Sequence, residues 1–147
     1  MVYCKKLFWR FWTREKGSKM DLHTVGTAAL AYLGDAVIEL MVRERLVAVG
    51  YSSSKALNAR ALDFVRASAQ AQAMEQLLPH LSEEEQGAFR RGRNIGHTNT
   101  PKRATVAEYR NATGMEALFG YLHAKGAHER MAELFALAYP DLANKTL

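Results

Sequence analysis

The chain of 147 residues contains a single cysteine, Cys4, and few features of a secreted or membrane protein. One cysteine excludes an internal disulfide framework and a cysteine-ligated zinc site, and it suits a reducing compartment such as the cytoplasm. No stretch approaches the roughly 18 consecutive apolar residues that a membrane-spanning helix needs, so no membrane partner is expected. A glycine-rich phosphate loop, a nucleophile elbow and a Ser-His-Asp order are also missing, which excludes the enzyme classes that depend on them.

What is present is typical of one globular domain with an excess of positive charge. The composition is 48% hydrophobic and 24% charged, with a formal net charge of +5, which favours an anionic partner such as nucleic acid. Residues 1–19 are basic and aromatic, and we interpret them as a disordered leader or an upstream extension before a start at Met20. An arm that touches RNA or a membrane surface is the alternative. Residues 20–147 then form the domain.

The domain is predicted to be all-α, because alanine and leucine dominate and alternating apolar–polar runs are few. Helices are expected over residues 24–49, from about 55, and over 67–78, 83–93, 105–125 and 127–139. Gly50 and Gly126 are predicted C-terminal stops, and the last helix is expected to end at Pro140. Two capping boxes are predicted where a hydroxyl residue precedes a glutamate by three positions: Ser82 with Glu85, and Thr105 with Glu108. Residues 94–104 form the one sizeable irregular loop.

The segment ALAYLGDAVIEL, residues 29–40, carries a carboxylate inside a mostly apolar helix. Its large apolar residues recur at three- and four-residue steps and form one stripe that is predicted to face the core: Leu30, Leu33, Val37, Leu40 and Met41. Asp35 points away from this stripe, among small or acidic residues. One turn further on, Val42 and Leu46 make the side of Asp35 apolar too. We therefore expect a central helix, buried on both sides, that carries Asp35 into a cleft.

A second carboxylate, Glu116, lies within the helix expected over residues 105–125. Small residues on its face, such as Thr113 and Gly120, leave room for a ligand to approach. Two carboxylates from different helices suffice to hold Mg²⁺, and a bound Mg²⁺ can activate water and stabilise charge on a phosphoryl oxygen. An ordinary exposed glutamate is the alternative for Glu116, and residue spacing alone does not show that it meets Asp35.

Basic residues flank the irregular loop on both sides. Together with Asn94 they form a candidate surface for phosphates and sugars: Arg90, Arg91, Arg93, Lys102 and Arg103. A solvated basic face is the alternative interpretation. The histidines show no metal-ligand spacing; His80, His97 and His128 are expected at the surface, whereas His123 shares a helical face with Glu116.

Three segments, in this order and spacing, resemble the ribonuclease III catalytic domain in its compact form, Mini-ribonuclease III. They are ALAYLGDAV around Asp35, RRGRN (90–94) followed by TPK (100–102), and YRNATGMEALFGYL (109–122). The resemblance covers residue 20 to the C-terminus. It implies an all-α, homodimeric endoribonuclease that cuts double-stranded RNA, with precursor 23S ribosomal RNA as substrate and 5′-phosphate and 3′-hydroxyl ends on the products. The family's Mg²⁺ ligands fall on Asp35 and Glu116, and Tyr32 falls on a position that packs across the dimer interface.

The chain departs from the longer ribonuclease III enzymes at three acidic positions, which are here Ala28, Ala31 and Thr113. Compact members share such losses, so we expect an active enzyme in which Thr113 and Glu39 are outer-shell candidates. A salt bridge at the surface or interface is the alternative for Glu39. We expect no appended double-stranded RNA-binding domain, so affinity is expected to come from the dimer surface and to depend strongly on salt. A catalytically inactive RNA-binding protein on the same fold is the first alternative function, and a helical scaffold is the second.

Overall fold

The computed structural model describes residues 20–96 and 102–144. The helices in these ranges, in chain order, are α2 (Thr27–Val49), α3 (Ser54–Val65), α4 (Ala67–Leu77), the short 3₁₀ helix η1 (Leu78–His80), α5 (Glu83–Arg93), α6 (Val106–Lys125), α7 (His128–Ala138) and α8 (Pro140–Asn144). No strand occurs in the described ranges, and the all-α prediction is confirmed. None of these helices is long and apolar enough to cross a membrane.

Local signals set most helix ends. At the start of α5 the backbone N–H of Glu85 donates to Ser82 Oγ at 3.2 Å, and that of Ser82 donates to Glu85 Oε2 at 2.8 Å. The second predicted capping box forms in the same way at the start of α6, and Gly50 and Gly126 take positive φ values of 116° and 78° at the ends of α2 and α6. The helix predicted to stop at Pro140 does end before it, at Ala138, but it is not the last helix. Pro140 begins α8, because the fixed φ of proline and its missing N–H suit the first position of a helix.

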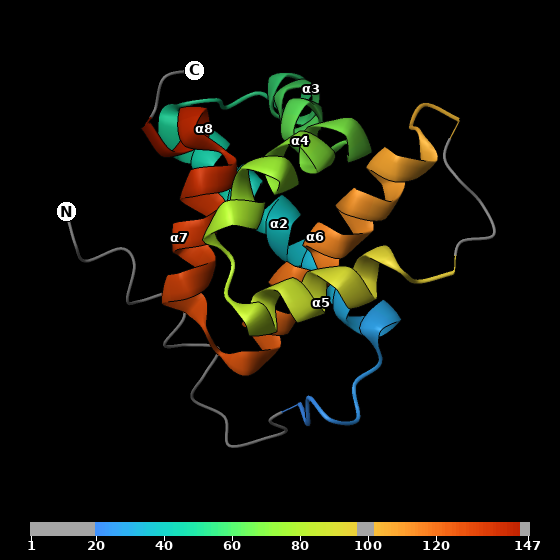
Figure 1. Cartoon of the computed structure of the whole chain (residues 1–147). Coiled ribbons are helices and arrows are strands. Elements are labelled where there is room, and N and C mark those ends of the chain that lie inside the picture. Colours follow the sequence, from blue (N-terminus) through green and yellow to red (C-terminus); the bar gives the residue numbers. More distant parts are fainter. Residues whose placement is uncertain (1–19, 97–101, 145–147) are drawn as a thin grey trace.

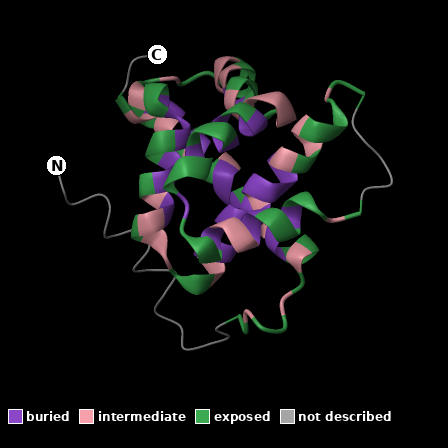
Figure 2. Cartoon of the chain, viewed as in Figure 1, coloured by how far each residue is buried: buried purple, intermediate pink, exposed green. Residues whose placement is uncertain are grey.

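The central helix of the molecule is α6, and not α2 as predicted. In Figure 1 α6 runs through the middle of the fold, with α5 crossing in front of it and α2 behind it. Figure 2 shows that the buried segments gather where these helices meet. From Ala112 to Leu122 every residue of α6 is buried except the half-buried Glu116. Small residues in this segment let helices pack against α6 on several sides at once.

Two glycines allow α2 and α6 to cross with their backbones in contact. A Cβ atom at Gly34 would lie 1.7 Å from the carbonyl oxygen of Glu116, and one at Gly120 would lie 1.9 Å from the carbonyl oxygen of Leu30. No side chain larger than hydrogen fits at either position. The crossing therefore places Asp35, the neighbour of Gly34, beside the turn of α6 that carries Glu116.

The predicted core stripe of α2 is confirmed except at Leu40: Leu30 and Val37 are buried, and Leu33 and Met41 are partly buried and pack against the core. The buried residues of this helix are Leu30, Ala31, Gly34, Val37, Ile38, Val42 and Leu46. Leu40, at 41% exposed, is the member of the stripe that lies outside the core. The face of α2 that meets α6 is centred on Gly34, which has no apolar side chain, so the pattern of large apolar residues does not reveal it. Asp35 lies at the edge of the buried face and not opposite to it.

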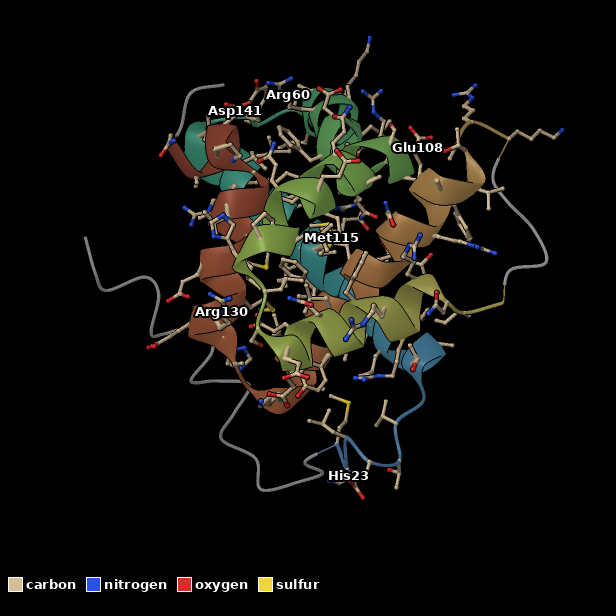
Figure 3. All side chains as sticks on the ribbon, viewed as in Figure 1. His23, Arg60, Glu108, Met115, Arg130 and Asp141 are labelled. Carbon is tan, nitrogen blue, oxygen red and sulfur yellow. The ribbon has the colours of Figure 1, made fainter. Side chains whose placement is uncertain are left out.

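Ion pairs tie the acidic first turn of α5 to the end of α6 and to α7. The guanidinium of Arg130 donates to both carboxylate oxygens of Glu85, at 2.8 and 3.0 Å, and Figure 3 shows Arg130 on α7. Lys125 Nζ lies 2.9 Å from Glu84 Oε2, and the Tyr121 hydroxyl also donates to Glu84. The acidic groups at the first turn of α5 are thus paired with cations of α6 and α7. They lie at the opposite end of α5 from its arginines.

Candidate active site

Asp35 and Glu116 come together at the crossing of α2 and α6. Burial, and after it the charge of Asp35, raises the pKa of Glu116 to about 8. The pKa of Asp35 is also raised, first by burial and then by the charge of Glu39 one turn along α2. Each carboxylate is thus harder to ionise than an isolated one, because water is partly removed and a like charge lies nearby.

The two carboxylates have no compensating partner in the described part of the chain. No hydrogen bond or ion pair joins Asp35 or Glu116 to another residue of these ranges. Within the same ranges no group of three or more His, Cys, Asp or Glu side chains converges. An exposed Asp35 beside a half-buried Glu116, with no cation of the described residues between them, fits a hard divalent ion such as Mg²⁺, which completes its coordination with water and substrate oxygens.

The predicted outer-shell residues are already engaged locally. Glu39 accepts a hydrogen bond of 2.6 Å from Arg43 Nη2, one turn further along α2. Thr113, 8% exposed, lies one turn before Glu116 and donates its hydroxyl hydrogen to the carbonyl oxygen of Tyr109 at 2.9 Å. The Thr113 oxygen keeps its acceptor capacity. The salt-bridge alternative for Glu39 is thus observed, and an outer-shell role for either residue stays a prediction.

The histidines differ from one another in how far they are buried. His80 is exposed, as expected, and His97 lies outside the described residues. His128 was expected at the surface but is partly buried, because the first turn of α7 packs against the end of α6. Its ring centroid lies 5.6 Å from that of His123, and burial lowers the pKa of both imidazoles.

The predicted basic residues lie at the C-terminal end of α5, which packs on α6 near Asn111 and Thr113, and just before the start of α6. Arg90, Arg91, Arg93 and Asn94 are exposed at the C-terminal end of α5, and Lys102 and Arg103 are exposed before the start of α6. None of these five cations pairs with an acidic group of the described residues, whereas Arg43, Arg60, Lys125 and Arg130 all do. We call these five cations and Arg110 the basic cluster. Its unneutralised charge distinguishes it from the four cations that form ion pairs.

Two residues of α6 were missed by the sequence analysis. Arg110 is exposed in the second turn of α6 and adds a sixth positive charge to the basic cluster. Asn111 accepts a hydrogen bond of 3.2 Å from Arg93 Nε. The charge of Arg110, two residues after the capping glutamate, was a usable signal. Asn111 has no such signal, because only the packing of α5 on α6 brings Arg93 near it. Figure 3 shows Glu108 at the outer end of α6 and Met115 near the centre of the fold, so this helix leads from the basic cluster to the carboxylates.

Residues 28–127 match the family model described as "Ribonuclease III domain", and the chain belongs to this family. Within it, the chain is similar to proteins named Mini-ribonuclease 3. It is 47% identical to that of Symbiobacterium thermophilum over 115 residues, 78% of this chain and 88% of the relative. It is 41% identical to that of Enterococcus faecalis over 116 residues, with coverages of 78% and 88%. The crystal structure of protein FN1578 from Fusobacterium nucleatum superposes with a TM-score of 0.72 at 29% identity, covering 80% of this chain and 93% of that one.

These similarities confirm the resemblance seen in the sequence and identify the domain as an endoribonuclease. The ribonuclease III family acts on double-stranded RNA. The fold, the paired carboxylates and the unneutralised basic cluster agree with this activity, because phosphodiester cleavage needs both a charge-stabilising centre and a surface for phosphates.

Proposed function

We propose that this chain is a cytoplasmic, Mg²⁺-dependent endoribonuclease that acts as a homodimer on double-stranded RNA, with precursor 23S ribosomal RNA as its substrate. The observation that carries the proposal is the pairing of Asp35 with Glu116 at a glycine crossing within a ribonuclease III domain. The ribosomal substrate rests on the similarity to Mini-ribonuclease 3 proteins.

Asp35 and Glu116 would hold the ion, since they lie near one another and no cation of the described residues pairs with either. When bound, Mg²⁺ supplies charge stabilisation and an activated water for hydrolysis of the phosphodiester. The protein itself holds the two carboxylates on rigid helices, so little reorganisation is needed when substrate arrives. Thr113, next to Glu116 on its helix, would hydrogen-bond water at the site through its oxygen.

The basic cluster would position the RNA backbone. Phosphate contacts by arginine and lysine fix the orientation of a duplex without reading its sequence, and duplex RNA is recognised mainly by shape, 2′-hydroxyls and phosphates. Asn94, at the C-cap of α5, supplies an uncharged donor and acceptor at the same place. Cleavage is therefore expected to weaken steeply as salt is added.

An exposed apolar face of α2 supports the dimer. Tyr32 is 85% exposed, Val47 is 59% exposed and Leu40 is 41% exposed, and at about 100° per residue these three positions lie on the same side of the helix, together with the exposed Ala36. Large apolar side chains that share one exposed face mark a contact surface. A second copy of the chain would cover this face in the proposed assembly.

Substitution of Tyr32 by glutamate is expected to give a monomer, because a charge on the most exposed apolar residue of this face would be buried in the dimer without a partner. Size-exclusion chromatography with light scattering measures the mass directly. Leu137→Glu, at an exposed leucine of α7, is the control and should leave the mass of the dimer unchanged. A wild-type protein with the mass of a monomer would refute this part of the proposal.

The nuclease activity is tested with a labelled RNA duplex, incubated with the protein in Mg²⁺ or in EDTA. Discrete cuts on both strands that require Mg²⁺ are expected, with 5′-phosphate ends. Binding without cleavage would instead indicate an RNA-binding protein, and the absence of both would indicate a helical scaffold. A duplex taken from precursor 23S ribosomal RNA, compared with an unrelated duplex of equal length, tests the substrate.

Mg²⁺ binding is expected to depend strongly on pH. Below a pKa of about 8 the ion must displace a proton from Glu116, so the apparent affinity should rise about tenfold per pH unit and level off above that pKa. Isothermal titration calorimetry at several pH values between about 6 and 9 measures this slope. Glu116→Gln should abolish binding, whereas Glu75→Gln, at an exposed glutamate of α4, should not change it. An affinity that is flat with pH would contradict the prediction.

A further inference from the structure

Among the arginines of the described chain whose side chains form hydrogen bonds to other side chains, Arg93 differs in its acceptor. Its Nε donates to the amide oxygen of Asn111 at 3.2 Å, whereas Arg43, Arg60 and Arg130 donate to carboxylates at 2.6 to 3.2 Å. A carboxylate partner neutralises most of the guanidinium charge, but an amide oxygen orients the group without neutralising it. The two Nη groups of Arg93 therefore keep both their charge and their hydrogens for another ligand.

The main chain at Arg93 is held rigidly against α6. A Cβ atom at the preceding residue, Gly92, would lie 2.4 Å from Ala117 Cβ and 2.9 Å from the carbonyl oxygen of Thr113. The end of α5 is thus pressed onto α6 as closely as a glycine permits. The backbone beside Arg93 is fixed by this contact, and its guanidinium is fixed by Asn111. Both contacts are made by α6, so this helix determines where the guanidinium lies.

The same helix carries Glu116. Asn111 precedes Glu116 by five residues, which is about 7.5 Å along the helix axis, and it lies on a different flank of α6. Arg93 is therefore tied, through Asn111, to the helix that carries Glu116. A phosphate bound to Arg93 would be a neighbour of the phosphodiester that is cut.

We propose that Asn111 is a positioning residue: it holds Arg93 so that the two Nη groups bind a backbone phosphate of the RNA at a set distance from Asp35 and Glu116. A planar guanidinium presents paired donors that match the oxygens of one phosphate. When one phosphate is fixed on a rigid helix, the positions of the next phosphates along the same RNA strand are fixed as well. This inference rests on the proposed ribonuclease function. It adds Asn111 as a residue that acts on the RNA through Arg93.

The test is a double-mutant cycle on the activity of the full chain, with Asn111→Ala, Arg93→Ala and the double variant. Steady-state cleavage of an RNA duplex in Mg²⁺ gives KM and kcat separately. Asn111→Ala is expected to raise KM about fivefold with kcat nearly unchanged, since one orienting hydrogen bond to a charged group is lost. In the Arg93→Ala background, Asn111→Ala should add nothing to KM, because no guanidinium remains to be positioned.

The variant Asn111→Asp distinguishes two possible roles of Asn111: positioning Arg93 for a phosphate, and stabilising the fold. Aspartate keeps the acceptor and strengthens the bond to Arg93, so a structural role predicts an equal or higher melting temperature and an unchanged KM. The proposal predicts that KM rises at least as much as in Asn111→Ala, because the guanidinium charge is now neutralised, and that this rise shrinks in the Arg93→Ala background.

An unchanged KM in Asn111→Ala and Asn111→Asp, or a rise in KM that persists without Arg93, would overturn the inference while leaving the nuclease intact. Failure of the wild-type protein to cleave or bind duplex RNA would instead overturn the proposed function. Melting temperatures of all variants within about 3 °C of the wild type show that any change in KM does not come from unfolding.

Discussion

Asp35→Asn is expected to lower the rate of Mg²⁺-dependent RNA cleavage by about 10³-fold or more, because a bound metal contributes several kcal/mol of transition-state stabilisation. The substitution keeps the shape of the side chain and removes its charge. At the crossing of α2 and α6 it leaves Glu116 as the one carboxylate facing the ion, and a single carboxylate holds Mg²⁺ weakly.

The same substitution has a second expected effect, on stability without metal. A carboxyl group whose pKa is raised in the folded protein destabilises it as the pH rises from the ordinary value of 4.5 to the folded value of about 8. Removing the charge of Asp35 lowers the pKa of Glu116 and relieves part of this loss. In EDTA at pH 8, Asp35→Asn should therefore melt at a temperature equal to or higher than the wild type.

Both effects can be measured on one preparation, by a cleavage time course and by a thermal melt. Asp63→Asn is the matched control, because Asp63 is an exposed aspartate of α3 that pairs with Arg60 away from the carboxylate pair. It should keep wild-type activity. Full activity in Asp35→Asn would remove this residue from the mechanism, and a large drop in melting temperature would show that its role is structural.

Gly34→Ala is expected to destabilise the protein by roughly 3 kcal/mol or more, the upper part of the range for overpacking a core. The new methyl group would lie 1.7 Å from the carbonyl oxygen of Glu116. This oxygen belongs to the backbone of α6, so it cannot move aside as the end of a flexible side chain can. The helices must separate, which also displaces Asp35 from Glu116. The melting temperature should fall by about 10 °C, and cleavage below that temperature should fall with it.

A second glycine in a helix provides the control for Gly34→Ala. At Gly87, in the middle of α5, a Cβ atom would meet only the flexible end of Arg91, at 3.3 Å. Gly87→Ala should therefore leave activity unchanged and stabilise the protein by up to about 1 kcal/mol, the helix propensity gained on replacing glycine by alanine. Similar melting temperatures for the two alanine variants would show that α2 and α6 do not need backbone contact.

The sequence predicted the helices well because their ends depend on residues within one turn. The hydroxyl of Ser82 and the carboxylate of Glu85 satisfy two backbone groups at the start of α5, and Gly126 ends α6 in a conformation that other residues avoid. Such signals need no information about the rest of the chain. The stop before Pro140 was predicted, but α8 was missed, because proline stops a helix in one position and begins one in another.

The sequence predicted most of the residues that α2 turns to the core but misplaced Leu40, because the helix is apolar on more than one face. Leu40 and Val47 are as hydrophobic as Leu30 and Val37, yet the first two are exposed and the last two are buried. The deciding residue is Gly34, whose missing side chain lets α6 approach. Hydrophobic periodicity counts large apolar side chains, so it points away from a contact made through backbone.

By itself, the sequence determined the all-α class, the helix ends and the two segments with the candidate carboxylates, since these features follow from local hydrogen bonding and from motifs that resemble the ribonuclease III family. Only the tertiary structure decided that Asp35 and Glu116 meet, that α6 is the central helix and that Asn111 holds Arg93. These contacts join residues far apart in the chain. They depend on glycines at helix crossings, where the absence of a side chain, and not its chemistry, sets the distance between helices.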